Sequence, residues 1–288
     1  MTMLDKPSTC SDQQIATAEA AMRSTERRLL DCVERLLADV PNADQRATLY
    51  AAAFEGSDPF PKRAVRPKVE IVYLVERLAD AHGLADTKVD TLLAATTGIV
   101  EYYDMLDDIV DGDVPNDRMP EAVVVAQTLV PLFVRRLAAL GPDAASAWSS
   151  RASVLLEAPY LEQRADPSLD TYRAVVDRQS KLFGFVTCLP AVIADADSAA
   201  VDAAATVGER YYVYEQYLLD REQIEESSPW NLWSLTSEST ARDELQAVQD
   251  QAMAAIEILP KIEAELVEPL LAHDLDTWDE QYSTCDAD

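Results

Sequence analysis

Apolar residues recur at the spacing of an α-helix along almost the whole chain, and this pattern limits the fold more than any other feature of the sequence. No segment with the alternation of a β-strand extends beyond a few residues. Only 7 of the 288 residues are glycine, so the tight turns of a many-stranded sheet or a glycine-rich phosphate loop are scarce. Apolar residues make up 48% of the chain, which is enough to bury a large core. The sequence therefore predicts an all-α fold.

Capping residues and prolines indicate where the helices begin and end. Ser11 opens a capping box before the first helix, and Pro41 ends that helix. Pro131, Pro159 and Pro190 fall inside apolar stretches, where we expect kinks or breaks. The expected helices are Ile15–Val40, Asp44–Glu55, Pro67–Gly83, Thr87–Asp111, Pro120–Leu140, Asp143–Gln163, Ser168–Asp195, Ala199–Glu226, Trp230–Leu235 and Thr240–Glu268. No repeat or linker divides them, so we predict that residues 1–288 form a single domain of about ten helices.

The chain is strongly acidic, with 52 acidic residues against 24 basic ones and a net charge of −28 at pH 7. This charge repels backbone phosphates and excludes non-specific binding to nucleic acid. The acids are spread along the sequence, which is typical of a halophile-like surface adapted to a salty cytoplasm. The apolar run from Ala122 to Val134 is too short to span a membrane, and the N-terminus has no apolar signal core. We expect a cytoplasmic protein without a membrane span.

Four aspartates share one face of the expected helix Thr87–Asp111. Asp104, Asp107, Asp108 and Asp111 follow i, i+3, i+4, i+7 spacing. Like charges at this spacing weaken a helix, and no lysine or arginine lies nearby in the sequence to offset them. A short aspartate motif also arises by chance in an acidic chain, but this one lies on a largely apolar helix. Converging carboxylates need a cation, and hard oxygen ligands suit Mg²⁺ that is shared with substrate phosphates.

A basic cluster precedes the third expected helix. It contains Lys62, Arg63, Arg66 and Lys68, in a chain where bases are otherwise sparse. Such a cluster serves either as a solvated turn or as a clamp that holds a diphosphate near a helix start. The sequence leaves these two interpretations open.

In this order, these segments resemble motifs of the trans-type prenyl diphosphate synthases, the polyprenyl synthetase family. The similarity extends from about Phe60 to Leu235. Arg63 and Arg66 match the KRxRP element that binds diphosphate, and 107–111 is similar to the first aspartate-rich motif. The resemblance implies that Asp107, Asp108 and Asp111 are catalytic and bind Mg²⁺.

Two later helices carry further motif residues. Arg178 and Lys181 lie in a segment that resembles the KT-x-x-LF helix, and 208–223 resembles the second aspartate-rich motif. In that motif Gln216 and Asp220 are kept. The resemblance implies that Asp220 binds metal and that Arg63, Arg66, Arg178, Lys181 and Gln216 contact substrate.

The family resemblance also implies the overall architecture and the reaction. The expected fold is an all-α bundle around a deep central cavity, commonly a homodimer. The expected reaction belongs to isoprenoid biosynthesis: Mg²⁺-dependent ionisation of an allylic diphosphate, followed by attack of isopentenyl diphosphate. Tyr102 and Tyr103 lie about one turn below Asp107, where aromatic residues in the family go with short products. We therefore expect a product of about fifteen to twenty carbons. Both tyrosines are candidate residues of the tail pocket, and Tyr102 is the expected floor.

The second motif departs from the family pattern. Leu219 and Gln223 replace two aspartates, whereas Glu222 and Glu226 offer substitute oxygen ligands on the same helix. Three functions therefore remain open. The chain is an active short-chain prenyltransferase, a catalytically impaired homologue that dimerises with a related active synthase, or another class I isoprenoid enzyme such as a cyclase.

Overall fold

The described part of the chain is built from helices. A computed structural model describes residues 3–55, 60, 68–224, 228–259 and 263–283. Among these residues there is no β-strand, only an isolated bridge between Ser8 and His273, so the all-α prediction is confirmed. The α-helices are α1 Asp12–Leu37, α2 Ala43–Phe54, α3 Val69–Ala81, α4 Asp86–Val110, α5 Met119–Leu140, α6 Pro142–Leu155, α7 Glu157–Glu162, α8 Leu169–Ile193, α9 Ser198–Glu222, α10 Leu232–Leu235, α11 Glu238–Ile258, α12 Ala264–Val267 and α13 Leu275–Ser283, and the short 3₁₀ helices are η1 Met3–Asp5 and η3 Glu268–Leu270.

Several helix ends follow the local signals in the sequence. The Ser11 side chain caps α1, and the Gln14 side chain binds back to the Ser11 backbone, so the predicted capping box is confirmed. The expected helix 143–163 is divided at Leu156 into α6 and α7, close to Pro159, where the sequence predicts a kink or break. No break occurs at Pro131 and Pro190, which lie inside the continuous helices α5 and α8. The packing of these helices outweighs the cost of about 3 kcal/mol that an internal proline imposes.

The expected helix 240–268 ends earlier than predicted. Helix α11 stops at Ile258, and Leu259 has an extended backbone with ψ of 120°. The next residue in the sequence is Pro260, and the residue before a proline disfavours helical backbone. A short helix, α12, and the 3₁₀ turn η3 follow. This proline was the signal in the sequence that marked the boundary.

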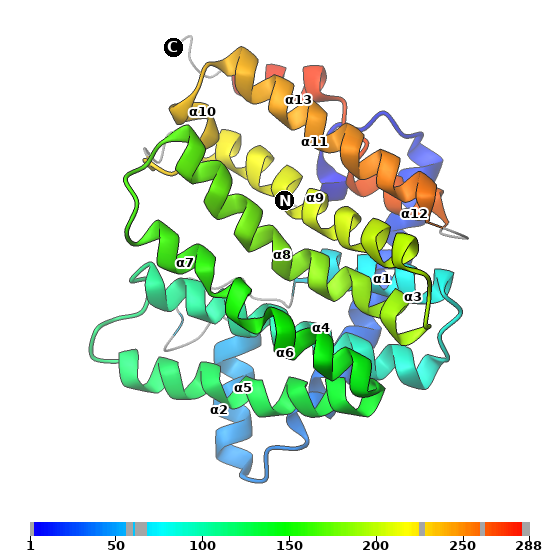
Figure 1. Ribbon diagram of the computed structural model, residues 1–288, viewed down its shortest axis with the longest axis vertical. Coiled ribbons are helices and arrows are strands. Elements are labelled where there is room, and N and C mark those ends of the chain that lie inside the picture. Colours follow the sequence, from blue (N-terminus) through cyan, green and yellow to red (C-terminus); the bar gives the residue numbers. More distant parts are fainter. Residues whose placement is uncertain (1–2, 56–59, 61–67, 225–227, 260–262, 284–288) are drawn as a thin grey trace.

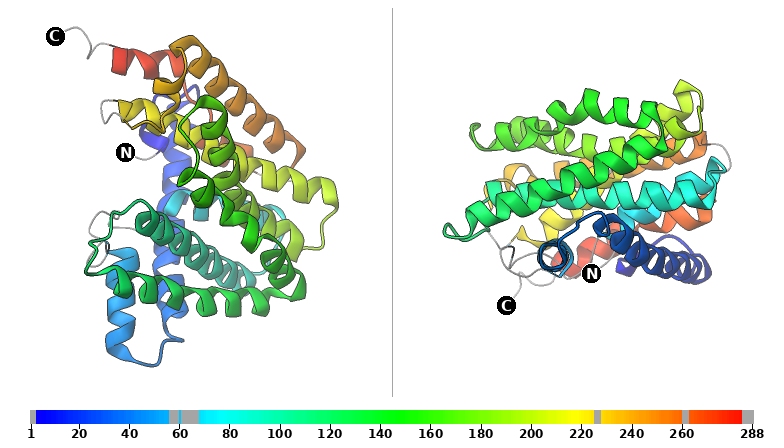
Figure 2. Two further views of the ribbon diagram at one scale, coloured as in Figure 1. Left: turned by 60° about the vertical axis from the view of Figure 1, so that its left-hand side comes forward. Right: turned by 90° about the horizontal axis from the view of Figure 1, so that it is seen from below.

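Long helices form two groups that face each other. Helices α8, α9 and α11 lie side by side in the upper half of Figure 1, and α4 and α5 lie side by side across the lower half. Figure 2 shows α1 along the back of both groups. The contact between α8 and α9 is very close, because a Cβ atom on Gly208 would lie 2.2 Å from the Thr187 hydroxyl and 2.4 Å from the Phe183 carbonyl.

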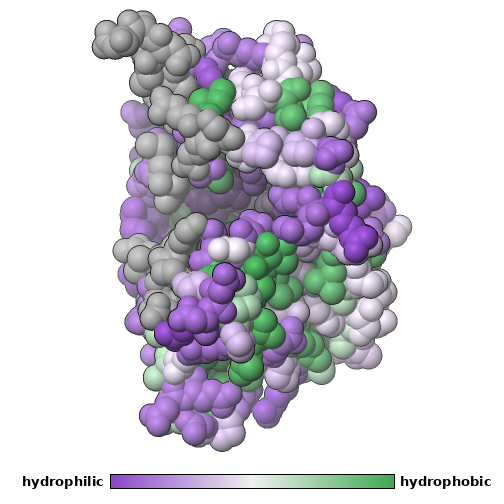
Figure 3. All heavy atoms as spheres, turned by 90° about the vertical axis from the view of Figure 1, so that its left-hand side faces the viewer, coloured by the Kyte–Doolittle hydropathy of each residue, from purple (hydrophilic) through white to green (hydrophobic). Residues whose placement is uncertain are grey.

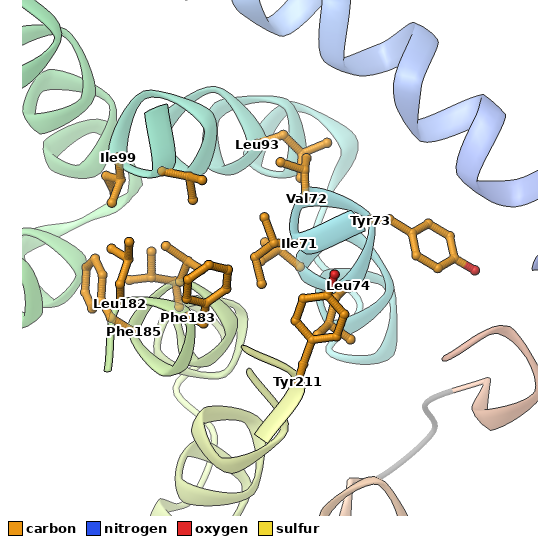
Figure 4. Close-up of a cluster of buried hydrophobic side chains, with 14 of the residues drawn as sticks. Ile71, Val72, Tyr73, Leu74, Leu93, Ile99, Leu182, Phe183, Phe185 and Tyr211 are labelled. Carbon is orange, nitrogen blue, oxygen red and sulfur yellow. The ribbon is translucent and has the colours of Figure 1, made fainter. Parts of the chain in front are cut away.

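The core joins α3 and α4 to α8 and α9. Figure 4 shows Ile71 and Leu74 of α3, Leu93 and Ile99 of α4 and Phe185 of α8 converging in one cluster. Each of these side chains is almost fully buried, and burial of one such side chain stabilises the fold by about 1.5–3 kcal/mol. This cluster fixes the distance between the two groups of helices.

Helix α5 is largely apolar. Of the helices in the described part of the chain, it is the one long and apolar enough by length and composition to cross a membrane. The apolar segment is therefore longer than the expected run 122–134. One face, with Leu129 and Phe133, is buried where α5 packs against α4, and a core helix of a bundle has the same composition. The other face exposes Val123 and Val124.

The N-terminal segment is held against the C-terminal part of the chain. Its backbone bonds to residues 272–274, with Thr9 N donating to Ala272 O at 2.8 Å. The Lys6 side chain is only 6% exposed and forms an ion pair with Glu222 at the end of α9. The backbone N–H of Met3 donates to Glu70 of α3 at 2.7 Å. The segment therefore joins α3, α9 and the C-terminal part through polar contacts.

We predict that Lys6→Met lowers the free energy of unfolding by about 3 kcal/mol, because it leaves the Glu222 carboxylate without its partner in a largely buried position. Urea denaturation at neutral pH measures this change. The matched control is Lys88→Met on the exposed surface of α4, which should change stability by less than about 0.5 kcal/mol. Equal effects of the two substitutions would contradict the role of the Lys6–Glu222 pair.

Candidate functional site

A narrow cleft opens between α4 and the pair α8 and α9, on the side where α7 lies in Figure 1. Its cavity volume is about 90 Å³. The face of the molecule seen in Figure 3 is hollowed near its middle, and hydrophilic residues lie in and around the hollow. The described residues that line the cleft are Lys68, Val100, Tyr103, Asp104, Leu106, Asp107, Leu155, Ala158, Pro159, Gln179, Leu182, Phe183 and Tyr212.

The first aspartate-rich motif lies at the C-terminal end of α4, beside the cleft. Asp107 and Asp104 line the cleft, and the Lys68 ammonium lies 2.5 Å from Asp104 Oδ1. Asp108 is half-buried, and Asp111 is the C-cap residue that follows the last residue of α4. Helix α7 is joined to this end of α4, because Gln163 Nε2 donates to Val110 O at 3.3 Å.

Helix α7 brings a further carboxylate to the motif. Asp107 is open to solvent within the cleft, but enclosure by the surrounding protein and the carboxylates of Asp111, Glu162 and Asp104 raise its pKa to about 7. Burial and the Asp111 carboxylate also raise the pKa of Glu162. These side chains are close enough to repel one another, so a cation placed among them would be stabilised.

The donor set fits a hard divalent cation, since all of its side chains are carboxylates. The described residues do not, however, form a closed group of three or more histidine, cysteine, aspartate or glutamate side chains around a metal-sized position. The end of the cleft is therefore an open set of oxygen ligands. A bound diphosphate would supply the remaining ligands of a metal held there.

Asp220 of the second motif has a different environment. Its side chain accepts hydrogen bonds from Tyr172 Oη at 2.6 Å, Gln216 Nε2 at 2.8 Å and the Leu232 N–H at 2.7 Å. These bonds connect α9 to α8 and to the start of α10. Asp220 is 3% exposed, and neither Asp220 nor Gln216 is among the described residues that line the cleft. The Asp220 oxygens therefore already have protein donors, and the metal-binding role that the resemblance implies stays a prediction.

The expected substitute ligands are also placed elsewhere. Glu222 pairs with Lys6, whereas Glu226 lies outside the described residues. Arg63 and Arg66 of the basic cluster lie outside them as well. Lys68, the last base of that cluster, is the one that the structure places at the cleft.

Two expected substrate contacts on α8 are engaged in ion pairs. Arg178 Nε lies 3.3 Å from Glu157, and Lys181 Nζ lies 2.8 Å from Glu209. Neither side chain is among the described residues of the cleft. Gln179 lies between them in the sequence and does line the cleft, because this position of α8 faces α4.

The two tyrosines of α4 have separate roles. Tyr103 lines the cleft, and its ring lies 6.1 Å from the ring of Trp148. Tyr102 instead packs 5.9 Å from Phe133, and Gln127 Nε2 donates to its hydroxyl at 3.3 Å. Of the two tyrosines, Tyr103 is therefore the one that lines the cleft, whereas the expected role of Tyr102 as the floor of a tail pocket stays a prediction. Adjacent residues on a helix point about 100° apart, so one of the two had to face away.

Sequence reasoning missed Glu162, Gln179 and Tyr212 as residues of the site. A signal for Tyr212 was present, because it lies four residues after Gly208 on the helix face that meets α8.

Comparisons with known proteins locate this architecture among solved structures. No protein-family model matches the chain, and no curated protein matches it. A geranylgeranyl pyrophosphate synthetase from Geoglobus acetivorans is similar in structure, with a TM-score of 0.69, 14% identity and coverage of 92% of this chain and 98% of the other. A farnesyl/geranylfarnesyl diphosphate (FPP/GFPP) synthase from Zymomonas mobilis has a TM-score of 0.70, 15% identity and coverage of 88% and 98%.

A polyprenyl synthase from Caulobacter crescentus, solved with calcium and isoprenyl diphosphate, has a TM-score of 0.66, 17% identity and coverage of 91% and 96%. The chain has the isoprenoid synthase fold. The expected resemblance to the prenyl diphosphate synthases is thus confirmed at the level of the fold. At such identities the roles of individual residues must be argued from this chain's own geometry.

We predict that Asp107→Asn flattens the pH dependence of stability in the metal-free protein. The pKa of Asp107 is about 7 in the folded chain and about 3.9 in an unfolded one. Between these values the folded state binds more protons at Asp107, so the contribution of this residue to stability falls as pH rises from about 4 to 7. Urea unfolding across this range with a chelator present measures the slope.

The control for this experiment is Asp117→Asn, in the exposed loop after α4. This variant should keep the wild-type slope. An identical slope in wild type and Asp107→Asn would show that burial and the neighbouring carboxylates do not raise the pKa of Asp107.

Proposed function

We propose that the chain is a prenyl diphosphate synthase-like protein that binds an allylic isoprenoid diphosphate with Mg²⁺ in the cleft. The observation that carries this proposal is the set of repelling carboxylates at the mouth of an otherwise apolar cleft. Asp107, Asp111 and Glu162 would hold the metal, with Asp108 next to them on α4. The solved Caulobacter crescentus protein was found with a divalent cation and an isoprenyl diphosphate, which supports this assignment.

The proposed reaction is transfer of the allylic prenyl group to isopentenyl diphosphate. Bound Mg²⁺ would stabilise the charge of the leaving diphosphate. The chain's own contribution is to orient the head and to exclude water from the tail. Leu106, Leu182 and Phe183 surround the tail side of the cleft, and an apolar lining of this kind protects a reactive cation from water.

A second candidate function is that of an impaired homologue that assists an active synthase. Specific contacts favour it. The Asp220 side chain already accepts hydrogen bonds from protein donors, and the Arg178 and Lys181 side chains are paired with carboxylates. We therefore propose a structural role for Asp220 in place of the metal-binding role expected from the sequence. Fewer cations would then act on the diphosphate, and each 1.36 kcal/mol of lost stabilisation slows the reaction about tenfold.

We further propose that residues 1–288 act as one domain in the cytoplasm and assemble through α5, as a homodimer or with a related synthase. The outer face of α5 exposes Val123, Val124, Gln127 and Pro131, with Glu121 and Arg135 towards its two ends, where they pair with Arg118 and Asp39. In a chain of net charge −28, a face whose centre is uncharged and whose end charges are paired allows two anionic subunits to meet with few opposing carboxylates.

Calorimetry with Mg²⁺ and a non-hydrolysable allylic thiolodiphosphate tests the proposed site. We predict that the wild type binds the analogue only when Mg²⁺ is present, and that Asp107→Ala and Asp111→Ala abolish binding because they remove the metal ligands. Asp117→Ala is the matched control and should bind as the wild type does. Equal affinity in all four proteins would refute the metal site.

Product analysis with labelled isopentenyl diphosphate distinguishes the two candidate functions. We predict that the isolated chain elongates more than about tenfold more slowly than an ordinary synthase, since the described bases Arg178 and Lys181 are paired with carboxylates. Addition of the chain to an active synthase should change the rate or the product length if it is a partner. A normal rate for the isolated chain would support the first function.

We predict that Tyr103→Ala admits longer tails than the wild type. Tyr103 lines the cleft and is backed by Trp148, so its removal extends the tail pocket. Binding of diphosphates of increasing chain length measures the preference. Tyr102→Ala should leave the preference unchanged, although truncation of a buried aromatic ring costs about 3–5 kcal/mol of stability. A shift in Tyr102→Ala but not in Tyr103→Ala would reverse this assignment.

A further inference from the structure

A hydrogen-bonded pair joins α8 to α9 along one wall of the cleft. The Tyr212 hydroxyl donates to Gln179 Oε1 at 2.9 Å, and both side chains line the cleft. The Tyr212 ring is stacked on Phe183, with ring centroids 4.4 Å apart and an angle of 29° between the planes. The ring is therefore held in one position, and its hydroxyl holds the Gln179 amide in one orientation.

The orientation leaves the donor end of the amide available. Gln179 Oε1 accepts the tyrosine hydrogen, whereas Nε2 makes no hydrogen bond to any described residue. An amide nitrogen carries two N–H donors and no charge. Burial and the Asp107 carboxylate raise the pKa of Tyr212 well above its usual range, so its hydroxyl stays protonated and able to donate.

The charges around the cleft explain why a neutral donor is useful there. Among the described lining residues Lys68 is the one cation, and it is paired with Asp104. The Asp107 and Glu162 carboxylates, where α4 and α7 meet, repel an anionic ligand. A neutral N–H donor attracts a phosphate oxygen without neutralising the carboxylates that hold the metal.

We infer that Gln179 Nε2 donates to the diphosphate head of the ligand, and that Tyr212 is a positioning residue that aims this donor. The inference rests on the proposed function, because it assumes that an isoprenoid diphosphate occupies the cleft. It assigns head-group recognition to a tyrosine–glutamine pair at positions where the sequence suggested Arg178 and Lys181.

Calorimetry with Mg²⁺ and the allylic thiolodiphosphate tests the pair. Gln179→Leu removes one hydrogen bond to a charged group and should weaken binding about tenfold or more. Tyr212→Phe keeps the stacked ring but releases the amide, and should weaken binding about fivefold. Tyr212→Phe in the Gln179→Leu background should cause no further loss, since the amide that it aims is absent.

Two further measurements separate this role from a structural one. The matched control is Tyr217→Phe on the same helix, outside the described cleft lining, which should bind the analogue as the wild type does. The prenyl alcohol with the same tail but no diphosphate should bind equally well to the wild type, Gln179→Leu and Tyr212→Phe. Circular dichroism confirms that each variant keeps its helicity.

Losses that multiply in the double variant, or wild-type affinity in Tyr212→Phe, would overturn the pair while the proposed function stands. Equal loss of alcohol and diphosphate binding would also overturn it, because the pair would then shape the tail pocket only. A wild-type chain that binds no diphosphate would overturn both the pair and the proposed function.

Discussion

The close contact of α8 and α9 is the constraint on which the cleft depends. Gly184 and Gly208 leave no room for a side chain at this contact, since a Cβ atom at either would lie within 2.5 Å of atoms of the other helix. The contact places Phe183 beside Tyr212 and Gln179 within hydrogen-bonding distance of its hydroxyl. One wall of the cleft is thus set by the absence of two side chains rather than by an attractive interaction.

Opposite this wall, the C-terminal end of α4 carries acidic side chains whose charges are only partly balanced by basic ones. Lys68 pairs with Asp104, but burial and the surrounding carboxylates raise the pKa of Asp107 to about 7. An arrangement that costs stability in this way is characteristic of functional sites. It persists because the apolar core between α3, α4 and α8 fixes the helices independently of the acids.

The second aspartate motif shows that a residue can change its role while the fold stays the same. Asp220 is kept in the sequence, but its oxygens connect α9 to α8 and α10. Glu222, two residues later, anchors the N-terminal segment through Lys6. The fold is that of solved prenyl synthases at 14% to 17% identity, whereas these contacts belong to the chain itself.

The sequence by itself determined the all-α class, the capping box at Ser11 and the acidic face of α4, because these depend on spacing and on contacts within a few residues. Only the tertiary structure decided which side chains meet across the cleft. It selected Tyr103 over Tyr102 and joined Gln179 to Tyr212, and it paired Lys6 with Glu222 across 216 positions of sequence. Such choices follow from how closely the helices approach and how they are rotated about their axes, which packing sets and local patterns do not encode.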